Sequence, residues 1–323
     1  MRTTMRKMAV AALFAAATAP AYAQPAYPSQ PVRFIVPYAP GGLPDVVIRQ
    51  VSARLSERLG QGMVVENRPG AGGVSAAQTM LSSPADGYTY VFSDAAMVSI
   101  SPLVMKNMPY DPRKDFVPVS YTARAPNFIA VHPSVPANTF AEFVALVKAK
   151  PGKITCGSSG IGSLHHLTLE LMKSSLGLDV VHVPFRGSGQ SVPAMLGGQV
   201  DCLLASLAPI AGIASTGRVR ILAVAGTQPT AVAPEIPAIG EAMKGFNSAF
   251  VLGVLGRRGL PDDVVHKMSS EIAAVVKEPE MQKAMAKLGI EPVGGSPEQY
   301  REALRVDGEQ MAQAARIGNL KAE

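Results

Sequence analysis

The chain has 323 residues, of which 47% are hydrophobic and 17% are charged, and its formal net charge at pH 7 is +6. Three of the basic residues lie in the first 23 positions, which hold no Asp or Glu, so the rest of the chain carries only +3. This small excess argues against nucleic acid as a partner, and roughly 300 residues is long for one hydrophobic core, so we expect two lobes.

The N-terminal segment has the three parts of a secretory signal peptide. Basic residues precede an apolar, alanine-rich run at positions 8–19, and Ala21-Tyr22-Ala23 offers small side chains for cleavage after Ala23. The run is shorter than the roughly 18 residues that a membrane-spanning helix needs, and no later segment stays apolar for that long. We therefore expect residues 1–23 to be removed and the mature chain to be exported and soluble.

From residue 32 onward the chain repeats one plan, in which a strand is followed by a glycine-rich loop and a helix. The pattern predicts strands at 32–36, 63–66 and 88–92, glycine loops at 38–44 and 67–73, and helices at 45–59 and 74–81. This order favours a parallel sheet with helices on its faces.

The same order returns in the second half of the chain. We predict strands at 154–156, 180–184 and 200–204, loops at 157–162 and 186–189, and helices at 163–176 and 191–196. An extended run through residues 129–131 predicts the first crossing between lobes, and the segments 220–225 and 250–255 bracket the return.

Three helices, at 262–276, 279–288 and 297–317, complete the chain, and we expect them to pack on the first lobe. The predicted fold is α/β with two lobes, each a mainly parallel sheet flanked by helices, joined by hinge strands. We assign residues 24–124 and 247–323 to the first lobe and 125–246 to the second.

The glycine loops predict where a ligand binds. In an open parallel sheet, ligands lie outside the carboxyl ends of the strands, and glycine lets backbone N–H groups at a helix start approach an anion. Two facing loops of this kind would hold a small carboxylate. The candidate ligand-binding residues in the two lobes are Tyr38, Gly41, Gly42, Leu43, Asp45, Ser93, Asp94, Ser158, Ser159, Gly162, Ser163, His166, Arg186 and Ser206.

Several of these residues have a second interpretation. Asp45 could cap its own helix or could receive a hydroxyl or ammonium group of the ligand, and Ser163 could cap the helix that it precedes. Arg186 could pair with a carboxylate or stay solvated in its loop. His165 and His166 are adjacent on a helix and point about 100 degrees apart, so they cannot both bind one metal, and we predict no metal site.

The sequence motifs of common enzyme classes are incomplete or absent in this sequence. Gly160-Ile161-Gly162-Ser163-Leu164-His165 ends in His where a dinucleotide fingerprint needs Gly, and no Walker A or His-Glu-x-x-His motif occurs. A hydrolase that uses Ser159 with one of the nearby histidines is the enzyme alternative, without any spacing to support it. We expect no catalytic residues and no cofactor.

The two cysteines, Cys156 and Cys202, each lie in an apolar, strand-like run. Two buried thiols and one disulfide are equally compatible with that placement. Their spacing fits no metal site.

Longer motifs give the sequence a specific resemblance that covers the whole chain after residue 23. Pro40-Gly41-Gly42-x-x-Asp45 follows the first predicted strand, and Gly157-Ser158-Ser159-Gly160-x-Gly162-Ser163-x-x-His166-Leu167 follows the strand that opens the second lobe. With the run at 65–73 and Pro84-Ala85-Asp86-Gly87-Tyr88-Thr89, these motifs resemble the Bug-type extracytoplasmic solute receptors of tripartite tricarboxylate transporters (TTT).

The resemblance implies a periplasmic binding protein of type II fold that is not an enzyme. It would capture a di- or tricarboxylate in the interlobe cleft and deliver it to the membrane permease subunits of a tripartite transporter. In that family the first glycine loop and the Gly-Ser loop of the second lobe hold the ligand carboxylate. We expect a monomer.

Ligand identity and the receiving partner stay open at this point. Leu43 and Pro44 stand where relatives often carry Ser or Thr. These two apolar side chains would suit an aromatic dicarboxylate such as terephthalate. The acidic side chains of Asp45 and Asp94 are also compatible with a solute that carries an amine. A receptor that presents its ligand to a signalling kinase is the alternative to one that serves a permease.

Overall fold

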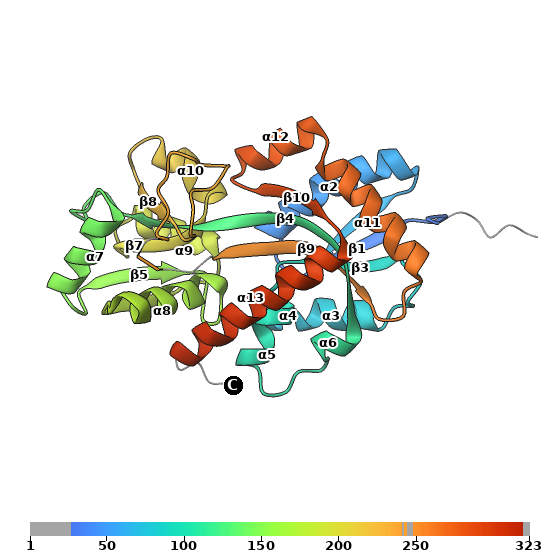
Figure 1. The fold of residues 1–323 in the computed structure, drawn as a ribbon, viewed down its shortest axis with the longest axis horizontal. Coiled ribbons are helices and arrows are strands. Elements are labelled where there is room, and N and C mark those ends of the chain that lie inside the picture. The colour runs from blue at the N-terminus through green and yellow to red at the C-terminus, as the bar shows by residue number, and fades with distance from the viewer. Residues whose placement is uncertain (1–26, 241, 244–247, 319–323) are drawn as a thin grey trace, which may run out of the picture.

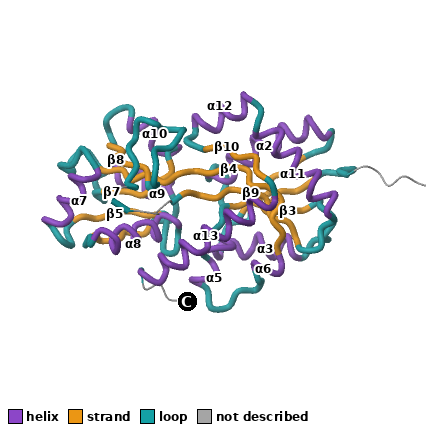
Figure 2. The backbone as a smooth tube through the Cα atoms, viewed as in Figure 1, coloured by secondary structure: helices purple, strands orange, loops and turns teal. Residues whose placement is uncertain are grey.

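The computed structural model describes residues 27–240, 242, 243 and 248–318. The predicted signal peptide therefore lies outside the described residues. Figure 1 shows an elongated α/β molecule with a first lobe around β1 to β3 and a second lobe around β5 to β7. In Figure 2 the strands form a middle layer with helices on both sides. No helix within the described ranges combines the length and apolar character needed to cross a membrane.

The first lobe is built on the predicted parallel strands. β1 (Val32–Val36) pairs in parallel with both β2 (Met63–Asn67) and β3 (Thr89–Ser93). The helix α2 (Leu43–Leu59) follows β1, and η1 (Ala71–Gly73) and α3 (Val74–Leu81) follow β2. Phe34 and Ile35 of β1 belong to different hydrophobic clusters, because successive side chains point to opposite faces of the sheet.

The second lobe repeats this plan. β5 (Ile154–Ser158) pairs in parallel with β6 (Val180–Pro184) and β7 (Cys202–Ser206). The helices α8 (Leu164–Leu176) and α9 (Ser188–Leu196) follow the first two of these strands. The two helices α7 (Phe140–Ala149) and α10 (Ala208–Ala214) were not predicted from the sequence.

Two long antiparallel strands join the lobes. β4 (Phe116–Val131) pairs with β9 (Ala249–Arg257) over its first part and with β7 and β8 (Arg220–Val224) over its last part. β9 pairs in turn with β3 of the first lobe. The crossing predicted at 129–131 is therefore the end of a 16-residue strand. The residue boundaries assigned to the two lobes stay a prediction.

The C-terminal helices pack on the first lobe, as predicted, and one of them also reaches the second lobe. α11 (Asp262–Val276) packs on α2, and α12 (Pro279–Lys287) leads into β10 (Glu291–Gly295), which pairs with β4. The 21-residue helix α13 (Pro297–Ile317), however, contacts both α4 (Ala96–Ser99) of the first lobe and α8 of the second (Figure 1). The prediction was incomplete for α13, because its apolar face continues past the first lobe into the second.

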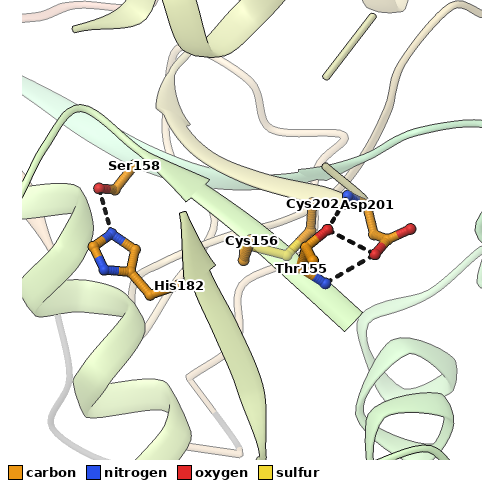
Figure 3. Close-up of a disulfide and its surroundings, with 6 residues drawn as sticks. All are labelled: Thr155, Cys156, Ser158, His182, Asp201 and Cys202. Carbon is orange, nitrogen blue, oxygen red and sulfur yellow. Dashed lines mark hydrogen bonds between the residues drawn. A yellow bond between two sulfur atoms is a disulfide. The ribbon is translucent and has the colours of Figure 1, made fainter. Parts of the chain in front are cut away.

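The structure decides between the two interpretations of the cysteines. Cys156 and Cys202 are fully buried, lie opposite each other on the parallel strands β5 and β7, and form a disulfide (Figure 3). The bond joins neighbouring strands within the second lobe. It is compatible with an exported protein, since disulfides persist in oxidising compartments.

Candidate functional site

The segment after β3 and the start of α8 meet where the two lobes touch. A small cavity of about 10 Å³ lies there, between Asp94, Ala95 and Ala96 after β3, Leu164 at the start of α8, Phe250 of β9 and Asp307 of α13. Close by, a Cβ atom on Gly162 would lie 3.5 Å from Val104 of α5 (Ser101–Val104). Thr230, between β8 and β9, donates a hydrogen bond to Glu291 of β10. The lobes are thus in contact around a space that holds about one water molecule.

The first glycine loop is held by Asp45. Its carboxylate accepts hydrogen bonds from the Gly41 N–H at 2.9 Å, from Arg49 Nε at 3.0 Å and from Asn67 Nδ2 at 2.8 Å. Burial alone would raise the pKa of Asp45, but these three donors outweigh it and hold the pKa below its usual range. Gly42, not Asp45, is the N-cap of α2. Asp45 therefore braces the loop from inside the helix.

A second network joins the first loop to the end of β3. Tyr38 Oη donates to Asp94 Oδ1 at 2.6 Å, the Ala96 N–H donates to the same oxygen at 3.1 Å, and Ser93 Oγ lies 3.4 Å from it. Asp94 is only 5% exposed. Burial raises the pKa of Asp94, although the hydrogen bonds from Tyr38 and Ala96 oppose the shift.

In the second lobe the Gly-Ser loop is tied to the start of α8. Ser163 is the N-cap of this helix, accepting from the His166 N–H at 3.2 Å and donating to the Gly160 carbonyl at 2.7 Å. The Gly162 N–H donates to His166 Nδ1 at 3.1 Å. Of the two interpretations of Ser163, the capping role is the one that these contacts support.

Ser158 and Ser159 each pair with a histidine. Ser158 Oγ lies 2.6 Å from His182 Nε2, as Figure 3 shows, and Ser159 Oγ lies 2.6 Å from His165 Nδ1. His165 Nε2 has no hydrogen-bond partner, so no carboxylate orients this ring. A Ser-His-acid triad is therefore not formed by these residues within the described ranges.

The three histidines around this loop favour the neutral form. Burial lowers the pKa of His165 to about 4, and burial together with the neighbouring His166 lowers that of His182 to about 4. Burial also lowers the pKa of His166. The rings of His166 and His182 stack with their centroids 4.0 Å apart. Neutral imidazoles supply hydrogen-bond partners to this loop and no positive charge.

Three further predicted site residues, Ser206, Arg186 and Leu43, do not line the cavity. Ser206 is the last residue of β7 and is 6% exposed. Arg186 is exposed on the loop after β6, and its backbone N–H donates a hydrogen bond to Gln190 Oε1. The solvated interpretation of Arg186 fits this placement. Leu43 is the first residue of α2 and is partly buried.

Sequence reasoning missed Asp307, although a signal for it is present. Tyr300, Leu304, Asp307 and Met311 follow one another at helical spacing, and all four are buried on α13. An acid in the middle of an apolar helix face is rarely fully buried unless it is paired or has a role. The pattern indicates that Asp307 is an unusual buried acid, but not which residues it faces in the fold.

The chain matches a known receptor family and two curated relatives. The family described as tripartite tricarboxylate transporter family receptor, TctC, matches residues 47–319. A UPF0065 protein from the tcbD–tcbE intergenic region of Pseudomonas sp. strain P51 is 33% identical over 290 residues, which cover 88% of this chain and 85% of that protein. Protein BugT of Bordetella pertussis is 30% identical over 277 residues, 85% of each chain.

Solved structures share the fold over nearly the whole chain. An R. palustris protein with adipate, Rpa4515, superposes with a TM-score of 0.84 at 30% identity, covering 92% of this chain and 100% of that one. MatC from Rhodopseudomonas palustris with bound malate superposes with a TM-score of 0.76 at 25% identity, covering 90% of this chain and 100% of the other. These likenesses confirm the predicted two-lobed periplasmic binding protein fold.

Proposed function

Because this chain belongs to the tripartite tricarboxylate transporter receptor family, TctC, we propose that it captures a small carboxylate between its lobes and delivers it to a membrane permease. The observation that carries the proposal is the position of the cavity. It lies where the loop after β3, the start of α8 and the hinge strand β9 meet. Related structures bound to adipate and malate support a carboxylate as the ligand.

The chemistry of the two loops suits an anion. The 13-residue helix α8 begins beside the cavity, and the first N–H groups of a helix lack acceptors within it. These N–H groups and the helix dipole attract a carboxylate without needing a cationic side chain. Asp45 and Ser163 use their side chains to shape the loops, so we propose that the backbone supplies much of the binding surface.

Closure of the lobes is the proposed mechanism. A ligand that contacts both lobes stabilises the form in which they touch, and the rotation is absorbed by the two strands that join them, β4 and β9. The permease would then recognise this closed form. We propose that the protein acts in the periplasm after removal of residues 1–23, with residues 24–124 and 247–323 as one lobe and 125–246 as the other.

A thermal-shift screen of the mature protein tests the function. Adipate, malate, citrate and terephthalate are each added at equal ionic strength, with adipamide as a control that lacks the carboxylates. We expect at least one acid to raise Tm, because a ligand at about 100 times its Kd stabilises the folded state by about 2.7 kcal/mol. If neither these acids nor amino acids such as aspartate and 4-aminobutanoate raise Tm above the adipamide and salt controls, the carboxylate proposal is wrong.

A further inference from the structure

Two buried carboxylates line the cavity between the lobes. Asp94 follows β3 and is 5% exposed, and Asp307 lies on α13 and is 8% exposed. They come from segments more than 200 positions apart in the chain. The ion pairs of the described residues include no cation bound to either one. Burying an anion without a counter-charge is costly, and either a bound proton or a cation relieves that cost.

Each carboxylate has capacity for a further hydrogen bond. The donors to Asp94, which come from Tyr38, Ala96 and Ser93, all reach Oδ1, and within the described residues none reaches Oδ2. The hydroxyl of Ser99 lies near Asp307, but its distance and angles do not form a hydrogen bond within the described residues. Both residues are more than nine-tenths buried, and both line the same small cavity.

The electrostatics of the pair agree with this geometry. Burial, reinforced by the charge of Asp94, raises the pKa of Asp307 to about 7. The titratable groups near the pair include Tyr38 and Tyr300, whose pKa values are raised well above normal by burial and by Asp94. They also include His165, which packs against Phe250 and whose pKa is lowered by burial to about 4. These groups are neutral at pH 7 and supply no positive charge.

The space matches a cationic nitrogen in size. A cavity of about 10 Å³ holds roughly one water molecule, and an ammonium group has a similar volume with three N–H donors. Leu164 and Phe250 give the cavity apolar walls, and apolar surroundings strengthen a charge-assisted hydrogen bond. The start of α8, at Leu164, lies beside the pair, so an anionic group of the same ligand has a site close to the cationic one.

We propose that Asp94 and Asp307 form a subsite for a cationic nitrogen, so that the receptor takes a carboxylate that also carries an ammonium group. The inference rests on the proposed function and narrows its ligand to a zwitterion. An unsubstituted diacid would place no charge against the two aspartates, or would place a like charge there.

Isothermal titration calorimetry of the mature protein with matched acids tests the subsite. The probes are aspartate against succinate and 4-aminobutanoate against butanoate, which differ only in the amino group. We expect the amino acid of at least one pair to bind about tenfold or more tighter than its partner, the factor typical of a hydrogen bond to a charged group. Binding of the amino acid at pH 7 should also release protons, seen as a buffer-dependent heat.

Substitution of the aspartates assigns the preference to them. Asp94→Asn and Asp307→Asn preserve volume and remove buried charge, and each should abolish the amino-acid preference and the proton release. The exposed Asp179→Asn is the matched control and should change neither. Equal affinities within both pairs, or a preference that survives both substitutions, would overturn the subsite while leaving carboxylate capture intact. Failure of every acid, here and in the thermal-shift screen, would overturn the proposed function itself.

Discussion

Replacing Asp45 by Asn tests whether this residue braces the first glycine loop. The carboxylate is 2% exposed and accepts hydrogen bonds from Gly41, Arg49 and Asn67. An amide in the same place offers one acceptor oxygen and turns an NH₂ group toward a donor, so at least one buried donor loses its partner. Hydrogen bonds to a charged group, together with one unsatisfied donor, give an expected loss of roughly 2–4 kcal/mol in the free energy of unfolding.

Urea denaturation at pH 7 measures the loss, and Arg49→Gln is the matched control. Arg49 is about half exposed, so its pair with Asp45 should contribute less than about 1 kcal/mol. Because the pKa of Asp45 is lowered, its stabilisation is present above the ordinary value of 3.8 and is lost as the pH falls through the folded-state pKa. The deficit of Asp45→Asn should therefore shrink in acid.

The same variant separates the two interpretations of Asp45. A brace predicts a loss of both stability and acid affinity, because Gly41 and Gly42 lose their anchor. An unchanged free energy of unfolding combined with abolished binding would refute the brace and assign Asp45 to the ligand.

Three further predictions concern stability and pH. Replacing Cys156 and Cys202 by Ala should lower the free energy of unfolding in urea by roughly 2–4 kcal/mol, because the disulfide links positions 46 apart; an unchanged value would contradict this. The pKa of His165 is lowered to about 4, so its stabilisation is present above 6.5 and lost as the pH falls through 4. Between pH 6.5 and pH 4, His165→Gln should therefore lose roughly 3 kcal/mol less free energy of unfolding than the wild type. Measurements of Tm against pH test this difference. The raised pKa of Asp307 gives stability that is lost as the pH rises through about 7. Asp307→Asn should therefore exceed the wild type in free energy of unfolding by roughly 2–4 kcal/mol at pH 8, seen as a higher Tm, and should show no such gain at pH 4.

Local patterns predicted the repeated elements well because strand, loop and helix each leave a short-range signal. The segments at 32–36 and 180–184 coincide with β1 and β6. The helix expected from residue 45 begins at Leu43, because Pro44 at its second position is tolerated in a first turn. That shift of two residues moves Asp45 from the cap to the third helical position and changes its role.

Features that depend on distant pairing could not be predicted. The disulfide depends on Cys156 and Cys202 being opposite each other in the register of β5 and β7, which neither strand specifies alone. The apolar face of α13 shows that it is buried, but not that Tyr300 packs in the first lobe and Met311 in the second. For the same reason the pairing of Asp94 with Asp307 appears only in the folded chain.

The distance between the lobes in solution tests the central claim most directly. Val64 on the edge strand β2 and Val181 on the edge strand β6 are exposed and lie at opposite ends of the sheet. Spin labels on Val64→Cys and Val181→Cys report this distance by pulsed electron paramagnetic resonance, since the native cysteines are buried in a disulfide. The account predicts that a saturating acid from the screen shortens and narrows the distance distribution, whereas adipamide leaves it unchanged. A distribution that a bound acid does not change would contradict capture by lobe closure.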